Sequence, residues 1–279
     1  MSLMPLMPLK NHLKMCLLLL FVACTLLSCD FSLSTAATPT TTPSNQSNSQ
    51  LNTWYNTAPG VSVRYEDWKD PAGDEDIVTI VRFDLHDVNL SVAYQPAQPL
   101  LMGDWMRKEH ATAIINGGYF DQQENAEALV VANGQAFGTS YNGFGGMLSV
   151  NASGLTTLRA LSQQPYNPNS EQLQQATQSS PMLIFPGGKR AQFSADTASS
   201  RRSAVAMDKQ GRLLFISSPD TAFSLDEFAD LLVASDLSLN VALNLDGGAS
   251  TGLYVNAGTQ HVAIDSYVPL PIVVIVREK

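Results

Sequence analysis

Two short glycine motifs contain the residues best suited to chemistry. The sequence NGGYF at residues 116–120 follows an apolar run at 111–115, and DGGAS at residues 246–250 follows an apolar run at 241–245. Glycine pairs let the backbone adopt positive φ and approach a ligand closely, and their amides can form an anion-binding concavity. Two tight turns that need glycine only for shape are the alternative. Because each motif begins with Asn or Asp at a predicted strand end, we favour a functional role for both.

A third feature is the pair Arg201-Arg202, which lies just before a predicted strand at residues 204–207. The planar guanidinium fork of arginine suits phosphate or carboxylate, although a single arginine is more often a solvated surface residue. Arg202 becomes a candidate only together with the other motifs of the chain.

Four segments, in this order, resemble the phosphodiester glycosidases, the family that includes the uncovering enzyme, which removes N-acetylglucosamine from a phosphodiester. They are NGGYF at 116–120, PMLIFPGGK at 181–189, RSA at 202–204, and a capped helix that leads to LDGGAS at 245–250. The resemblance runs from about Ile77 to the C-terminus. The chain departs from the family pattern at two positions: Ala206 replaces a glycine that usually closes the strand after the arginine, and Tyr267 stands where the family often has an arginine before Val-Pro. The second departure bears on substrate preference or activity.

The resemblance implies a hydrolase that acts on a sugar linked through its anomeric carbon to a phosphodiester. Asp246 would be the carboxylate near the anomeric carbon, and Arg202 would hold the phosphate. Asn116 would bind sugar hydroxyls or phosphate oxygens, and Ser250 would orient Asp246 or donate to the phosphate. Because a phosphodiester is already a weakly basic leaving group, the main task is to stabilise an oxocarbenium-like sugar.

The remaining expected substrate contacts lie within the same two motifs: Gly117, Gly118, Tyr119, Gly247, Gly248 and Thr251. A second catalytic carboxylate is not assigned, and Asp121 and Glu124 are the nearest candidates. We expect no cofactor and no metal site, although Asp246 could bind a cation.

Two other functions stay open. Residues 248–252 match the G-x-S-x-G pattern of serine esterases with Ser250 as nucleophile, but that pattern needs a helix after the serine, and residues 253–255 are strand-like. His261 and Asp265 also follow Ser250 too closely and in reversed order. The non-enzymatic alternative is a lipid-anchored glycan-binding protein without turnover.

The elements that must position these motifs indicate an α+β single domain with a mixed, largely antiparallel sheet and a few helices. Apolar spacing predicts a helix over residues 225–237, which Ser224 and Glu227 cap at its start. Residues 77–85 and 89–94 are predicted as partner strands, and 204–207 with 213–216 as a hairpin. Residues 171–178 are polar and Gln-rich, which favours a surface excursion.

The N-terminal residues 1–28 have the pattern of a secretory signal: Lys10 and Lys14 precede an apolar run that ends at residue 27. The sequence LLSC at 26–29 resembles a bacterial lipobox, which implies that Cys29 is acylated and tethers the protein to a membrane. Residues 29–53 are polar and predict a flexible linker, followed by the globular domain at 54–279. The expected location is therefore outside the cytoplasm, facing the periplasm or the cell exterior.

The charge of the chain argues against nucleic acid as a partner. The sequence has 16 Lys and Arg against 25 Asp and Glu, a net charge of −9, and removal of residues 1–28 takes away two lysines and makes it −11. An acidic protein repels a polyanion unless local donors compensate. We expect a glycan or sugar-1-phosphodiester as the partner.

Overall fold

The computed structural model describes residues 50–193 and 198–279. The predicted signal sequence, Cys29 and most of the predicted linker therefore lie outside the described residues. Residues Ser47–Lys279 form a compact unit of their own. Within the described part of the chain, no helix is long and apolar enough to cross a membrane.

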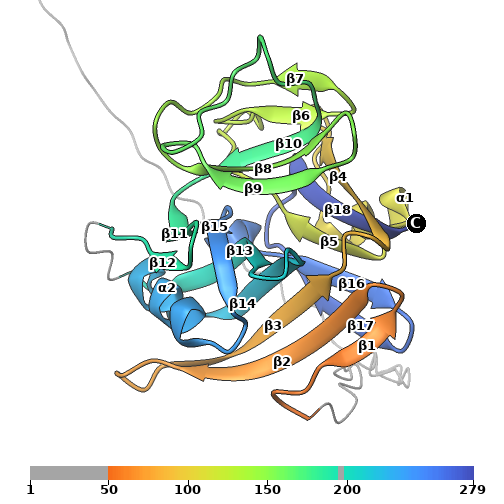
Figure 1. Cartoon of the computed structure of the whole chain (residues 1–279). Helices are drawn as coiled ribbons and strands as arrows, with labels where there is room; N and C mark the ends of the chain where they lie inside the picture. The colour runs from red at the N-terminus through yellow and green to blue at the C-terminus, as the bar shows by residue number, and fades with distance from the viewer. Residues whose placement is uncertain (1–49, 194–197) are drawn as a thin grey trace, which may run out of the picture. The chain divides into compact units, whose positions relative to one another are not determined.

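The domain consists of three antiparallel sheets (Figure 1). The largest has the strand order β1-β2-β3-β14-β13-β15-β11-β12. Its strands are β1 (Tyr55–Ala58), β2 (Val61–Lys69), β3 (Glu75–Phe83), β11 (Met182–Phe185), β12 (Lys189–Arg190), β13 (Ser200–Asp208), β14 (Leu213–Phe223) and β15 (Leu239–Asn244).

The two smaller sheets have five strands each. One has the order β7-β6-β10-β8-β9, with β6 (Val130–Ala132), β7 (Gln135–Phe137), β8 (Gly146–Asn151), β9 (Thr156–Ala160) and β10 (Leu173–Ser179). The other has the order β17-β16-β5-β18-β4, with β4 (Val88–Tyr94), β5 (Ala113–Asn116), β16 (Leu253–Ala257), β17 (Gln260–Ile264) and β18 (Ile272–Glu278).

Two α-helices lie on the outer faces of the sheets in the described residues. Helix α1 (Met102–Glu109) packs Met102 and Trp105 against β5 and β18. Helix α2 (Leu225–Ala234) covers the eight-stranded sheet, and Ser224 and Glu227 form the predicted capping box at its start. A short 3₁₀ turn, η1 (Gly248–Ser250), follows β15.

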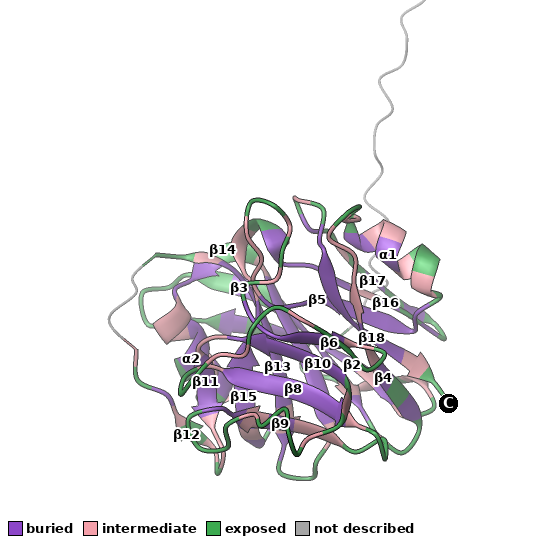
Figure 2. Ribbon diagram, turned by 90° about the horizontal axis from the view of Figure 1, so that it is seen from above, coloured by how far each residue is buried: buried purple, intermediate pink, exposed green. Residues whose placement is uncertain are grey.

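One apolar core is shared by all three sheets. Residues from β3, β5, β8, β14 and β18 meet in it, including the fully buried Phe83, Leu148 and Phe215. Figure 2 shows these strands as mostly buried, with exposed residues gathered in the loops. The ends of strands from different sheets therefore converge at the edge of a common core, and the candidate site lies at such a convergence.

Three expectations need correction. The described strand pairings are all antiparallel and form three sheets, so the fold is largely β rather than built on one mixed sheet. Strand β4 pairs with β18 and not with β3, which pairs with β2 and β14. The Gln-rich segment 171–178 is mostly strand β10, and its side chains Gln175, Thr177 and Gln178 are buried.

The polar sequence of β10 is typical of a surface segment, but its glutamines are buried because they have hydrogen-bond partners from other elements. Gln175 Oε1 accepts a hydrogen bond from the Val92 N–H of β4 at 3.0 Å, and Gln178 Oε1 accepts one from the Tyr141 N–H at 2.8 Å. A buried amide with such partners avoids the cost of desolvation, but the partners are distant in sequence.

Candidate active site

The two glycine motifs lie side by side where β5 and β15 end. The Asp246 N–H donates to the Gly117 carbonyl at 3.1 Å, and the Asn116 side-chain amide donates to the Asp246 carbonyl at 2.6 Å. The Asn116 Oδ1 accepts from the Gly252 N–H at 3.2 Å. Asn116 is fully buried, and these contacts fasten the end of β5 to both sides of the segment 246–252.

The glycines serve mainly close packing rather than positive φ. Of the four, only Gly248 has a positive φ, at 58°. A Cβ at Gly117 would lie 2.4 Å from Ile272 Cγ2, and one at Gly118 would lie 2.1 Å from the Gln178 carbonyl oxygen. Gly117 thus lets β18 approach, and Gly118 lets β10 approach. At the motif NGG, β18 of the same sheet and β10 of a second sheet therefore pack directly against the end of β5.

The carboxyl group of Asp246 is partly buried, and this burial raises its pKa from 3.8 to about 6. Hydrogen bonds from the Ser250 hydroxyl and the Gly247 N–H to the carboxylate lower the pKa of Asp246, while the negative charge of Glu127 raises it further. Burial wins because a charged carboxylate loses water that two donors do not fully replace. A carboxyl group that titrates near pH 6 can carry or release a proton close to neutral pH.

Tyr119 lies in a hydrogen-bonded group beside Asp246. Its hydroxyl donates to the Ser180 carbonyl at 3.0 Å and accepts from the Asn244 amide at 2.8 Å. Burial raises the pKa of Tyr119, followed by the negative charge of Asp246, while the positive charge of Arg202 lowers it. These influences place Tyr119, Asp246 and Arg202 in one electrostatic neighbourhood.

Arg202 enters the site from the start of β13. Its Nε donates to the Phe223 carbonyl at 3.0 Å and its Nη2 donates to the Ala198 carbonyl at 2.8 Å, and only 9% of the residue is exposed. The two carbonyls fix the plane of the guanidinium group. Arg202 is therefore a positive charge that is held in place by backbone carbonyls and acts on the neighbouring Tyr119, and it is not a solvated surface arginine.

Of the three acidic residues that follow the first motif, Asp121 and Glu124 have no effect on the pKa of Asp246, and Glu127 has one. Asp121 accepts from the N–H groups of Gln123 and Asn125 at 2.9 and 2.8 Å, and these local bonds, led by the one from Asn125, lower its pKa. Glu124 lies in the same turn, with a φ of 66°. Neither acts on the pKa of Asp246, whereas Glu127 does.

Glu127, Asn244 and Tyr141 are the site residues that sequence reasoning missed. Glu127 is exposed, and its N–H donates to the Tyr119 carbonyl at 3.0 Å, which ties it to the first motif. The charges of Glu127 and Asp246 also raise the pKa of Tyr141, after burial. The only signal for Glu127 was its nearness to the motif, and Asn244 could have been noticed as a polar residue at the end of an apolar strand.

The segment after Ser250 does not have the geometry of a serine esterase. Strand β16 begins at Leu253, so no helix follows the serine within this segment. His261 is exposed on β17, where it pairs with Asn256, and the interaction found for the Ser250 hydroxyl is with Asp246. Thr251 is fully buried beside it, and its hydroxyl has no hydrogen-bond partner in the described residues.

Arg201 and Tyr267 flank the 3₁₀ turn on its outer side. The Arg201 guanidinium lies 4.1 Å from the ring centroid of Tyr267, and the Tyr267 N–H donates to the Ala249 carbonyl at 2.7 Å. Arg201 also donates to the carbonyls of Pro219 and Asp265 at 2.7 and 2.9 Å. Tyr267 itself is 72% exposed, so its aromatic ring faces solvent next to the 3₁₀ turn.

A metal-binding cluster of three or more His, Cys, Asp or Glu residues does not occur within residues 50–193 and 198–279.

Comparisons with solved structures show the fold. The catalytic domain of zebrafish N-acetylglucosamine-1-phosphodiester alpha-N-acetylglucosaminidase, auto-inhibited by its pro-peptide, is similar with a TM-score of 0.63 and 18% identity over 82% of this chain and 87% of that chain. A hypothetical protein from Synechocystis is similar with a TM-score of 0.57 and 16% identity over 83% of this chain and 64% of that chain. A protein from Burkholderia pseudomallei that is described as exported is similar with a TM-score of 0.50 and 12% identity over 74% of each chain.

A search of curated protein sequences finds no match to this chain. The sequence profile of the phosphodiester glycosidase family, in contrast, matches residues 109–276. This stretch covers more than half of the chain and contains both glycine motifs, Arg202 and the 3₁₀ turn. The chain therefore belongs to the phosphodiester glycosidase family.

Proposed function

We propose that the domain hydrolyses the glycosidic bond of a sugar-1-phosphodiester in cell-envelope or extracellular glycans. The observation that carries this proposal is the partly buried carboxyl group of Asp246, whose pKa is raised to about 6, in a domain of the phosphodiester glycosidase family. The charges of Asp246 and Arg202 both act on Tyr119, which supports a site that contains all three residues. The similarity to the zebrafish enzyme supports the same reading at the level of the fold.

The chemistry requires negative charge near the anomeric carbon and positive charge near the departing phosphate. Above its pKa, the Asp246 carboxylate supplies the first, and the Ser250 hydroxyl and Gly247 N–H hold it in place. Arg202 supplies the second, because a guanidinium group stabilises the charge of a phosphodiester that leaves. Water then completes the hydrolysis at the anomeric carbon.

The other candidate residues shape the site around these two charges. In this proposal Tyr119, Gly248 and Thr251 would line the sugar and phosphate positions, together with Gly117, Gly118 and Gly247. We propose a positioning role for Asn116 in place of the expected substrate contact, because its side-chain amide is hydrogen-bonded to backbone groups of Asp246, Gly117 and Gly252. We therefore assign Asn116 to positioning Asp246 rather than to binding substrate.

The test is the release of free sugar from a sugar-1-phosphodiester such as UDP-N-acetylglucosamine by the full chain in detergent. We expect turnover by the wild type and a loss of at least about a hundredfold in Asp246→Asn, because the variant keeps the shape and loses the charge. Asp121→Asn is the matched control and should retain activity.

The same experiment separates the alternatives. Binding of the substrate without turnover by the wild type would favour a glycan-binding protein. Cleavage of a p-nitrophenyl ester that is lost only in Ser250→Ala would favour the esterase. Equal turnover by the wild type and Asp246→Asn would refute the assignment of Asp246.

We also propose that the protein is exported as a lipoprotein anchored through Cys29, which the LLSC sequence at 26–29 supports. Mass spectrometry of the mature N-terminus should find an acylated Cys29, and Cys29→Ala should move the protein out of the membrane fraction. An unmodified Cys29 in the wild type would contradict the anchor.

A further inference from the structure

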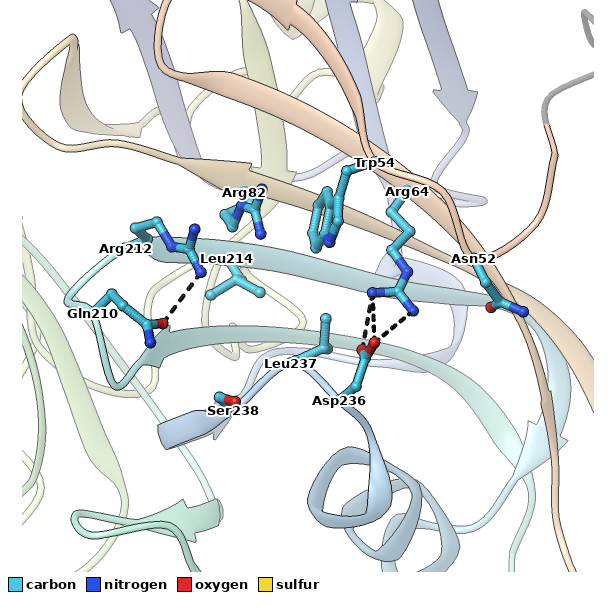
Figure 3. A pocket seen from close by; sticks show the side chains of 10 residues that line it. All are labelled: Asn52, Trp54, Arg64, Arg82, Gln210, Arg212, Leu214, Asp236, Leu237 and Ser238. Carbon is cyan, nitrogen blue, oxygen red and sulfur yellow. Dashed lines mark hydrogen bonds and ion pairs between the residues drawn. The ribbon is translucent and has the colours of Figure 1, made fainter.

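A cavity of about 340 Å³ lies in the eight-stranded sheet beside the segment that follows α2 (Figure 3). Arg64 of β2, Arg82 of β3 and Arg212, which precedes β14, reach into it from neighbouring strands. It is lined by Asn52, Trp54, Arg64, Arg82, Gln210, Arg212, Leu214, Asp236, Leu237 and Ser238. Three guanidinium groups thus converge in a chain whose net charge is −9.

This cavity is separate from the candidate active site. In the β13–β14 pairing, Arg202 lies opposite Ser218 at one end and Met207 lies opposite Leu213 at the other. The two ends are five residues apart, about 17 Å at the rise of a β-strand. The arginine cavity and Asp246 therefore lie at opposite ends of the same strands.

Two of the three arginines are neutralised by carboxylates. Arg64 donates to both oxygens of Asp236 at 2.9 and 3.1 Å, and its Nε lies 2.8 Å from Glu66. Arg212 donates to Asp208 at 2.6 Å and to Gln210 at 3.2 Å. Figure 3 shows the Arg64–Asp236 and Arg212–Gln210 contacts as dashed lines.

Arg82 differs from its neighbours. Within residues 50–193 and 198–279 its guanidinium has no hydrogen bond and no ion pair, and its contact is with the Trp54 ring, 3.8 Å from the ring centroid. Burial and the positive charges of Arg212 and Arg64 lower the pKa of Arg82, and only Asp208 acts against them. A partly buried guanidinium group without a carboxylate has an electrostatic cost that an anion would offset.

We propose that this cavity binds the phosphate or carboxylate group of a monosaccharide-sized ligand, with Arg82 as its main contact. A cavity of about 340 Å³ is in the size range of small-molecule sites. Trp54 packs against the guanidinium group of Arg82 at 3.8 Å, and the guanidinium fork can donate two parallel hydrogen bonds to an anion. Asn52, Gln210 and Ser238 provide neutral hydrogen-bonding groups for sugar hydroxyls. The inference does not depend on the proposed function.

Isothermal titration calorimetry on the full chain tests it, with glucose 6-phosphate, glucuronate and glucose as probes. We expect the wild type to bind at least one of the two anions and not glucose. Arg82→Gln should weaken that binding by about tenfold or more, since a charge-assisted pair is lost. Arg82→Lys keeps the charge but loses the fork, so it should bind with intermediate affinity.

Arg107→Gln is the matched control, because Arg107 is an exposed arginine on α1 that pairs with Asp104. A preference for glucose 6-phosphate identifies the phosphate as the group recognised, and a preference for glucuronate identifies the carboxylate. No binding of either anion at tens of millimolar, or equal binding by wild type and Arg82→Gln, would overturn the proposal.

Discussion

Burial and hydrogen bonding compete at the carboxyl group of Asp246, and burial prevails. Ser250 and Gly247 are close enough to favour the ionised form, yet the pKa remains near 6. Glu127 contributes to this result by charge repulsion. The pH at which the Asp246 carboxyl group ionises is therefore set in part by a residue outside both glycine motifs.

Glu127→Gln should move the acidic limb of the kcat/KM profile to lower pH. Removal of the negative charge takes away one of the causes that raise the pKa of Asp246, so the carboxylate forms at lower pH. We expect a shift of roughly 0.2–0.5 pH unit, because Glu127 is exposed and solvent screens its charge. The measurement is kcat/KM against pH between about 4.5 and 8 for wild type and variant.

Asp121→Asn is the control for this shift. Asp121 is half-buried and accepts hydrogen bonds within its own turn, so its removal should leave the acidic limb of the profile where it is. An unchanged limb in Glu127→Gln, or an equal shift in both variants, would show that the charge of Glu127 does not reach the reacting group.

At the scale of elements, the first glycine motif is a packing junction between strands. Gly117 faces Ile272 at the start of β18, and Gly118 faces the backbone of β10. The geometry of Asn116 and Tyr119 depends on this close approach, because both residues directly flank the glycines.

Gly118→Ala should destabilise the domain by about 3 kcal/mol and reduce activity as well. The new Cβ would lie 2.1 Å from the Gln178 carbonyl oxygen, and a backbone atom cannot move aside without shifting β10. Urea unfolding gives the change in the free energy of unfolding, and sugar release gives the change in activity.

Gly103→Ala serves as the opposite case. Gly103 lies inside α1, where alanine is the better helix former by up to ~1 kcal/mol, and its nearest neighbour is the movable end of the Tyr254 side chain. This variant should be neutral or stabilised. A Gly118→Ala protein with the stability and activity of the wild type would contradict the packing role.

Local patterns in the sequence predicted some of these elements well. Helix α2 begins at the predicted Leu225 with its capping box and ends at Ala234, three residues before the predicted end. The β13–β14 hairpin is also confirmed. Both depend on periodicity and turn residues that lie next to each other in the chain.

Pairings between distant segments could not be predicted in this way. Strand β4 pairs with β18, which lies near the other end of the sequence. Strand β10 buries glutamines whose hydrogen-bond partners lie on other elements. The same holds for the candidate site. The two glycine motifs can be recognised in the sequence, but only the folded structure brings Glu127 and Asn244 next to them. A polar strand and a charged loop residue have no local signal when long-range contacts decide their role.

For the whole molecule, the carboxyl group of Asp246 couples stability to pH. Its pKa is raised from 3.8 to about 6, so between these values the folded protein holds a proton that the unfolded chain has released. Stability from this group is fully present below about pH 4 and is lost as the pH rises through about 6. The charge that the proposed reaction needs therefore weakens the fold at neutral pH.

Asp246→Asn should accordingly be more stable than the wild type at pH 8 and equal to it near pH 4. A raised pKa of about two units corresponds to about 2–3 kcal/mol at full ionisation, and partial exposure makes about 2 kcal/mol the expected gain. Urea unfolding of both proteins at the two pH values measures it. Asp121→Asn should be less stable than the wild type at pH 8. Hydrogen bonds in the folded protein lower the pKa of Asp121, so loss of this carboxylate removes a favourable interaction. If Asp246→Asn were no more stable than the wild type at pH 8, the carboxylate would not be under the desolvation strain that sets its pKa.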